Sequence, residues 1–190
     1  MAVTVSNLIM GPGTLYRAAV DAVEPEDTAV NSTPAASAYT DVGGTMDGVT
    51  LAINQEYTEL AVDQVIDVPG RRKTKREFTI QTNLAEPTLE NLAFVMNEDE
   101  ATAVTTGTGF KKLEPSNDTS ATQPVYSKLL FDGFAPDSLA RRVIGRKMLS
   151  TDNVEFAYSK ENQTVFTATF SGHYVSPSIK PFVVIDEDAA

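Results

Sequence analysis

The sequence predicts a mainly β fold, in which two antiparallel sheets pack as a sandwich or open barrel, one α-helix flanks them, and extended arms lie at both ends. Two observations support this prediction. Apolar residues recur with a period of two in several segments, which is typical of half-buried strands, and a single stretch has the helical spacing i, i+3, i+4. The chain has 190 residues, a length that one domain can hold. We therefore expect one domain over residues 1–190.

The central unit, residues 48–97, is predicted to form a strand, a loop, a second strand and a helix. Alternation over 48–60 and over 77–84 indicates the two strands. Between them we expect a bend over 63–70 and then a basic loop. The apolar faces of the two strands carry Leu51, Ile53, Phe78 and Ile80. Their polar faces carry Asn54, Glu56, Glu77, Thr79, Gln81 and Asn83.

The helix of this unit is predicted to have about three turns and one apolar stripe that packs on the sheet. Pro87 suits the first helical position, and Glu86 and Glu90 complement the positive end of the helix dipole. The stripe consists of Leu89, Leu92, Ala93 and Met96.

The flanking segments are predicted from their turn residues and alternation. Residues 1–47 form an N-terminal arm and a surface connection, with strands before and after a turn at Gly11–Gly13 and an extended stretch over 21–47. Residues 98–124 form a mobile loop. Residues 125–190 form the C-terminal strands and arm: a strand within 125–137, with Asp132–Gly133 or Ala135–Asp137 as the turn, a strand over 138–150, a hairpin that pairs 154–158 with 166–170, and a terminal strand at 182–185.

Charge is distributed unevenly along the chain. The net charge is −11, from 26 acidic and 15 basic residues, which argues against a protein that grips nucleic acid. Nine of the cations fall into two acid-free clusters, and an acidic chain with two basic patches is suited to self-association between unlike faces. The clusters are Arg71, Arg72, Lys73, Lys75 and Arg76, and Arg141, Arg142, Arg146 and Lys147.

The residues that catalysis or metal binding would need are scarce. The chain has no cysteine and one histidine, His173, and it lacks the Gly-x-Ser-x-Gly elbow and the calcium-loop spacing. The stretch Gly107–Lys111 lacks the full spacing of a phosphate loop. We therefore expect no enzyme, metal or cofactor, and a structural or surface histidine. No apolar run approaches 18 residues, so we expect a soluble protein without an export signal.

Two blocks of the sequence resemble a known family. The arrangement GVTLAINQEYTELAVDQ, a variable loop and REFTIQTNLAEPTLENLA, followed by DGFAPDSLARRVIGRKMLSTDNVEFAYSKENQTVFTATFSGHYV, is similar to the major tail tube proteins of long, non-contractile-tailed bacteriophages. The resemblance implies a tail-tube fold and a subunit of hexameric rings that stack into a tube, through which genomic DNA passes without specific binding. The implied partners are other copies of the chain and the tape-measure, tail-tip and terminator proteins, with no membrane. The implied location is the virion, and the host cytoplasm during assembly.

The resemblance also implies roles for particular residues. The basic loop at 71–76 would contact the next ring, with either Glu98, Asp99 and Glu100 or Glu24, Glu26 and Asp27 as acidic partners, and the polar strand faces would line the lumen. From the residues themselves we also expect the N-terminal strand or the segment 182–185 to add to a sheet of a neighbouring subunit, because both are β-rich and terminal. The alternative is a non-viral β-sandwich binding or adhesion module. The absence of tryptophan and the few aromatic clusters argue against it.

Overall fold

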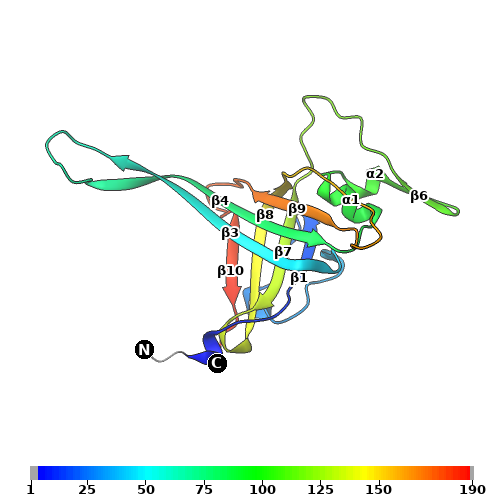
Figure 1. Ribbon diagram of the computed structural model, residues 1–190, viewed down its shortest axis with the longest axis horizontal. Helices are drawn as coiled ribbons and strands as arrows, with labels where there is room; N and C mark the ends of the chain where they lie inside the picture. The colour runs from blue at the N-terminus through cyan, green and yellow to red at the C-terminus, as the bar shows by residue number, and fades with distance from the viewer. Residues whose placement is uncertain (1–3, 189–190) are drawn as a thin grey trace.

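Residues 4–188 are described by a computed structural model, which is built mainly from antiparallel strands, as predicted (Figure 1). The larger sheet contains eight strands in the order β2, β1, β7, β8, β9, β4 and β3, and β10 pairs with β8. The bounds of these strands are β1 (Thr14–Ala19), β2 (Thr40–Asp41), β3 (Thr45–Leu60), β4 (Gly70–Leu84), β7 (Ser127–Phe134), β8 (Ala140–Ser150), β9 (Phe166–Gly172) and β10 (Phe182–Asp186).

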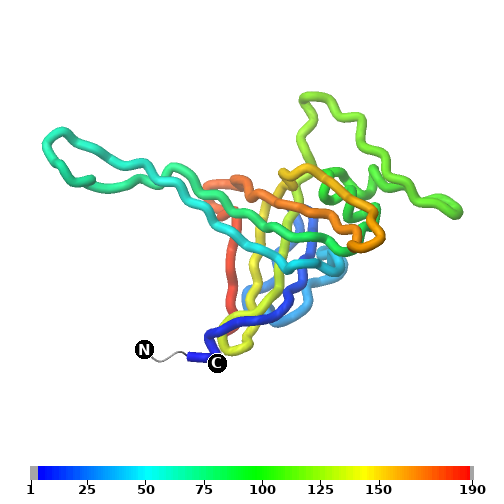
Figure 2. The backbone as a smooth tube through the Cα atoms, in the orientation of Figure 1, coloured from blue at the N-terminus to red at the C-terminus, as the bar shows by residue number. Residues whose placement is uncertain are grey.

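Strand β8 joins the two halves of this sheet. Along one edge it pairs with β7; along the other, Arg141–Gly145 pair with β10 and Met148–Ser150 pair with β9. As a result, β3, β4 and β9 cross over β1, β7, β8 and β10 (Figure 1, Figure 2). The predicted pair of packed sheets thus takes the form of one sheet folded over itself.

The main core lies between the two crossing halves. Strands β4 and β9 each turn alternate side chains inward, as predicted, and Leu129 of β7 and Met148 of β8 meet them from the other half. The inward residues are Phe78, Ile80, Leu84, Phe166, Ala168 and Phe170. Of the two residues predicted on the apolar face of β3, Leu51 packs at the margin of this core, whereas Ile53 is 47% exposed because β3 has already left the core there.

Helix α1 (Leu89–Val95) covers one end of the core and has two turns rather than three. Thr88 is its N-cap, since the Thr88 side chain accepts a hydrogen bond from the Asn91 backbone N–H, so Pro87 precedes the cap and does not take the first helical position. The Asn91 side chain donates a hydrogen bond to the Val42 carbonyl oxygen, so the helix face that carries Asn91 points inward. The buried residues are therefore Asn91, Ala93, Phe94 and Val95, and of the predicted stripe Leu89, Leu92 and Met96 stay partly exposed.

The segment 98–124 is more ordered than predicted in its first half. It contains helix α2 (Glu100–Ala103) and a separate hairpin of β5 (Val104–Gly107) and β6 (Phe110–Leu113). The Asp99 side chain caps α2 by accepting from the Ala101 N–H. The prediction of one mobile loop over 98–124 is therefore wrong for residues 100–113.

The segment between β1 and β3 covers the outer face of β1, β7 and β8, and is less solvated than predicted. Its 3-10 helix η2 (Asp27–Ala29) leads to Val30, which is buried, and Tyr39 packs with Leu130 and Ile144 in a second apolar cluster. An alanine-rich and serine-rich stretch was expected on the surface, but a few large side chains anchor it.

Three further predictions concern the ends and the last hairpin. In place of an N-terminal strand, residues 4–13 contain a 3-10 helix η1 (Val5–Asn7). Of the two predicted turns after residue 125, the one at Ala135–Asp137 forms, as η3 (Pro136–Ser138), whereas Asp132 and Gly133 lie within β7. Residues 154–158 form no strand, so the predicted hairpin with 166–170 is wrong. The terminal strand β10 exists, and it pairs with β8 of its own chain.

Candidate assembly surfaces

The β3–β4 hairpin extends far beyond the rest of the molecule as a two-stranded arm, residues 53–76 (Figure 1). Pairing continues from Thr45–Leu84 to Leu60–Gly70, and all of residues 53–69 and 71–76 are exposed. Within residues 4–188, β3 pairs only with β4, so its outer edge carries unpaired backbone groups over 16 residues. An unpaired edge of this length is a template for a strand of another chain.

The predicted basic loop is part of strand β4 and forms one side of this arm. Five cations in six residues suggested a loop, but β3 places acids opposite two of them, which favours the strand pairing. Arg71 Nη2 lies 2.6 Å from Glu59 Oε1, and Lys75 Nζ lies 3.6 Å from Glu56 and 3.4 Å from Glu77. The Glu77 carboxylate raises the pKa of Lys75.

The other three cations of the arm make no ion pair within residues 4–188. Lys73 lies over the ring of Tyr57, 5.7 Å from its centroid, and Arg76 lies 5.6 Å from the ring centroid of Phe182 at the base of the arm. Arg72 points to no charged partner in the described chain. The register shifts between Glu56 and Tyr57, which leaves Thr74 as an extra residue in β4. This bulge places Lys73 opposite Tyr57.

A polar face covers the outside of β3, β4 and β9, opposite the core. All six polar residues predicted on β3 and β4 are partly or fully exposed, and the four on β4 alternate with buried residues. Strand β9 extends this face, because Thr167, Thr169 and Ser171 pair with Asn83, Gln81 and Thr79. If β9 had been predicted to pair with β4, the alternation of β9 would have placed these three residues on the polar face.

The charge of the polar face is neutral to acidic. Glu56 lies in the arm and Glu77 at its root. Asp47 and Asp152 line a hollow of about 360 Å³ with Thr50 and other hydroxyl and amide groups. The cation nearest to this face along the register is Lys75, which is already paired with both glutamates. A surface of hydroxyls and acids gives phosphate groups little to bind.

The second basic cluster does not form a free patch, contrary to the prediction. Arg141 binds Asp186 through two hydrogen bonds, Arg142 binds Asp132 in the same way, and Arg146 binds Glu24. Lys147 lies 4.3 Å from the ring centroid of Tyr126. The hydrogen bond from Arg146 lowers the pKa of Glu24.

Several predicted acidic partners are occupied within the chain. Glu24 binds Arg146 and lies 3.5 Å from Lys128, Asp99 caps α2, and Glu98 accepts a hydrogen bond from the Ser116 hydroxyl. Glu100 forms an ion pair with Arg17 of β1. Of the six candidates, only Glu26 and Asp27 make neither an ion pair nor a side-chain hydrogen bond with any residue from 4 to 188.

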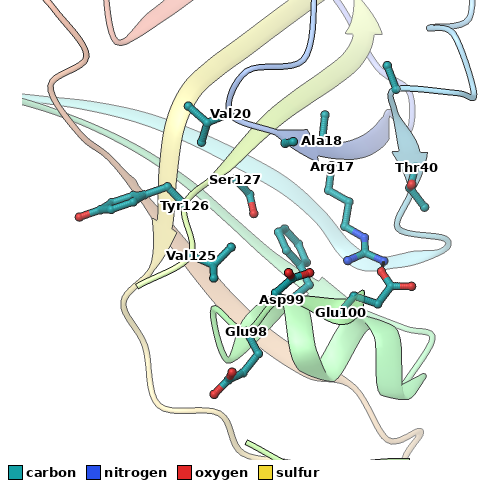
Figure 3. A pocket seen from close by; sticks show the side chains of 13 residues that line it. Arg17, Ala18, Val20, Thr40, Glu98, Asp99, Glu100, Val125, Tyr126 and Ser127 are labelled. Atoms are coloured by element: carbon teal, nitrogen blue, oxygen red, sulfur yellow. Dashed lines mark hydrogen bonds and ion pairs between the residues drawn. The ribbon is translucent and has the colours of Figure 1, made fainter. Parts of the chain in front are cut away.

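The Arg17–Glu100 pair lies beside a hollow of about 370 Å³ between β1, α2 and residues 125–127 (Figure 3). The Arg17 guanidinium also lies over the ring of Phe94, 5.5 Å from its centroid, and its Nε is buried without a hydrogen-bond partner. These contacts tie α1 and α2 to β1. Packing within the chain therefore explains the side chains of Arg17, Glu100 and Phe94 at this hollow.

The described residues offer few groups for catalysis. His173 Nδ1 lies 2.9 Å from the Ser171 carbonyl oxygen, and its ring packs edge-on against Tyr126. Residues 4–188 contain no group of three metal-ligating side chains. The longest helix in the same range, α1, has seven residues, and none could span a membrane. Comparisons of the sequence with protein-family models and with curated proteins find no match.

Proposed function

We propose that the chain is a structural subunit that associates with its own copies into hexameric rings, and that these rings stack into the tail tube of a long, non-contractile-tailed bacteriophage. The observation that carries this proposal is the arm. A two-stranded ribbon is marginally stable by itself in water, and this one leaves the core at Ile53 with 16 residues of β3 edge unpaired. Packing against other copies would cover both the ribbon and the edge.

The polar face supports the second part of the proposal, a conduit for DNA. Its outward residues on β3, β4 and β9 are hydroxyls, amides and carboxylates, and its nearest cation is paired. Lined by such residues, a lumen lets DNA pass without binding it. The number six and the tape-measure, tail-tip and terminator partners come from the family resemblance. The proposal includes no catalysis, metal or cofactor.

The direct experiment is electron microscopy together with size-exclusion light scattering of the purified chain over a range of concentrations. Rings or tubes are the expected result. A matched variant replaces residues 55–76 by Asn-Gly, which joins Asn54 to Glu77 through a two-residue turn. This variant should fold, since the core residues remain, but it should not form tubes.

One observation favours the alternative, a binding or adhesion module. Phe156 and Tyr158 lie edge-to-face on the surface, 47% and 82% exposed, and Phe156 lines a hollow of about 620 Å³ together with Asn162 and Gln163. Monodisperse monomers at every concentration would support this second function against the first.

A further inference from the structure

The tip of the arm, residues 61–69, has an unusual composition for a solvent-exposed turn. Four aliphatic side chains are exposed there: Val62 at 48%, Val65 at 50%, Ile66 at 105% and Val68 at 50%. The tip also carries Asp63 and Asp67 and no cation. Within residues 4–188, neither aspartate makes an ion pair. The tip is thus an apolar surface with negative charge, and no part of its own chain covers it.

A hollow with one unpaired cation lies at the base of the arm. It measures about 540 Å³ and is lined on its apolar side by Ile179, Phe182 and Val183, at the start of β10. Lys180 is exposed at its rim and makes no ion pair with any residue from 4 to 188. The second cation at the hollow, Arg146, is paired with Glu24, which also lines the hollow, so the unpaired charge there is that of Lys180. Apolar side chains beside a free lysine complement the apolar and acidic tip.

The tip cannot reach this hollow in its own chain. Phe182 stacks on Phe78 with ring centroids 4.5 Å apart, and Phe78 pairs with Ile53 at the root of the arm. The paired strand from Ile53 to Leu60 rises by about 3.3 Å per residue, so the tip begins about 23 Å beyond Phe182. Figure 1 and Figure 2 show the tip pointing away from β10.

We propose that the tip of the arm docks into the hollow beside β10 of a second copy, with Ile66 among the apolar side chains and Asp63 and Asp67 beside Lys180. This inference rests on the proposed self-assembly and names the surfaces that meet. The two surfaces are unlike, so the contact is heterologous. An open row of copies joined in this way has a free tip at one end and a free hollow at the other. Such a contact repeats without limit unless a rotation closes it.

Cysteine cross-linking tests this contact directly, because the chain has no cysteine of its own. An Ile66→Cys chain and an Ile179→Cys chain are mixed under the conditions that give assembly, and dissolved oxygen oxidises the paired thiols. We expect a disulfide between the two different chains, identified by mass spectrometry of the linked peptides. The matched control pairs Ile66→Cys with Val23→Cys, which places a thiol outside the hollow at a valine that is more exposed than Ile179, 84% against 46%.

An exchange of charge between the tip and the hollow provides the second part of the test. Asp63→Lys and Asp67→Lys in the Ile66→Cys chain should slow cross-linking about fivefold, and Lys180→Asp in the Ile179→Cys chain should restore it. Rings or tubes in the microscope with no cross-link above the Val23→Cys control would overturn the contact and leave the proposed function standing. Monomers with no cross-link would overturn both.

Discussion

Replacing Asp132 by asparagine is expected to destabilise the chain by about 3–5 kcal/mol, because it leaves the Arg142 guanidinium buried without its counter-charge. Arg142 is 1% exposed, and its Nε and Nη2 donate to the two Asp132 oxygens at 2.7 and 2.8 Å. The same guanidinium donates to the carbonyls of Ala29, at 3.1 Å, and Ser32, at 2.6 Å. The pair therefore holds the segment between β1 and β3 against the sheet.

This loss is large relative to the about 5–15 kcal/mol that stabilises a typical domain. For a chain of this size, the melting temperature should fall by roughly 6–20 °C. Urea unfolding at pH 7, followed by circular dichroism, measures the change in the free energy of unfolding. The matched control is Asp186→Asn, whose partner Arg141 is 33% exposed, so it should cost less than about 1 kcal/mol. Equal losses in the two variants would refute the reasoning.

Three further predictions concern acid stability, the arm and the polar face. The hydrogen bond from Arg146 lowers the pKa of Glu24 below its ordinary value of 4.5. The pair therefore stabilises the fold above that pH, and this stabilisation is lost as the pH falls further. In thermal melts from neutral to acidic pH, the melting temperature of Glu24→Gln should fall less than that of the wild type. Reversing Arg72 and Lys73 to glutamate should leave the melting temperature of the monomer nearly unchanged but weaken tube formation in light scattering, most at low salt. Tubes assembled from Gln81→Lys should retain short duplex DNA on sedimentation at low salt, whereas wild-type tubes should not.

The sequence was most informative where one face of a strand is buried. Alternation placed Phe78 and Ile80 in the core and Gln81 on the outside, and the structure confirms these faces. A one-residue shift of such a strand would move its apolar side chains from the core to solvent, so burial fixes the register. The same argument could not apply to residues 71–76, because both faces of the arm are exposed and no apolar period is needed.

The partners of the charged residues were harder to predict. Four clustered cations in β8 suggested a surface patch, yet Arg142 is buried and Arg146 binds Glu24, which is 122 residues away in the sequence. Of these partners, only Asp132 could have been found from the sequence, because the β7–β8 hairpin places it directly opposite Arg142. Residues 154–158 also misled the prediction. Val154 packs on the core and Phe156 on Phe166 without strand pairing, and Phe156 and Tyr158 remain exposed, so their alternation does not mark the buried face of a strand.

The most direct test of the proposed function is cryo-electron microscopy of the assembled protein, at a resolution that traces the strands. The proposal predicts stacked rings of six copies, with Thr79, Gln81 and Thr169 facing the lumen and the β3–β4 arm contacting another copy. Rings whose lumen is lined instead by the face that carries Lys73 and Arg76, or a protein that stays monomeric at every concentration, would contradict it.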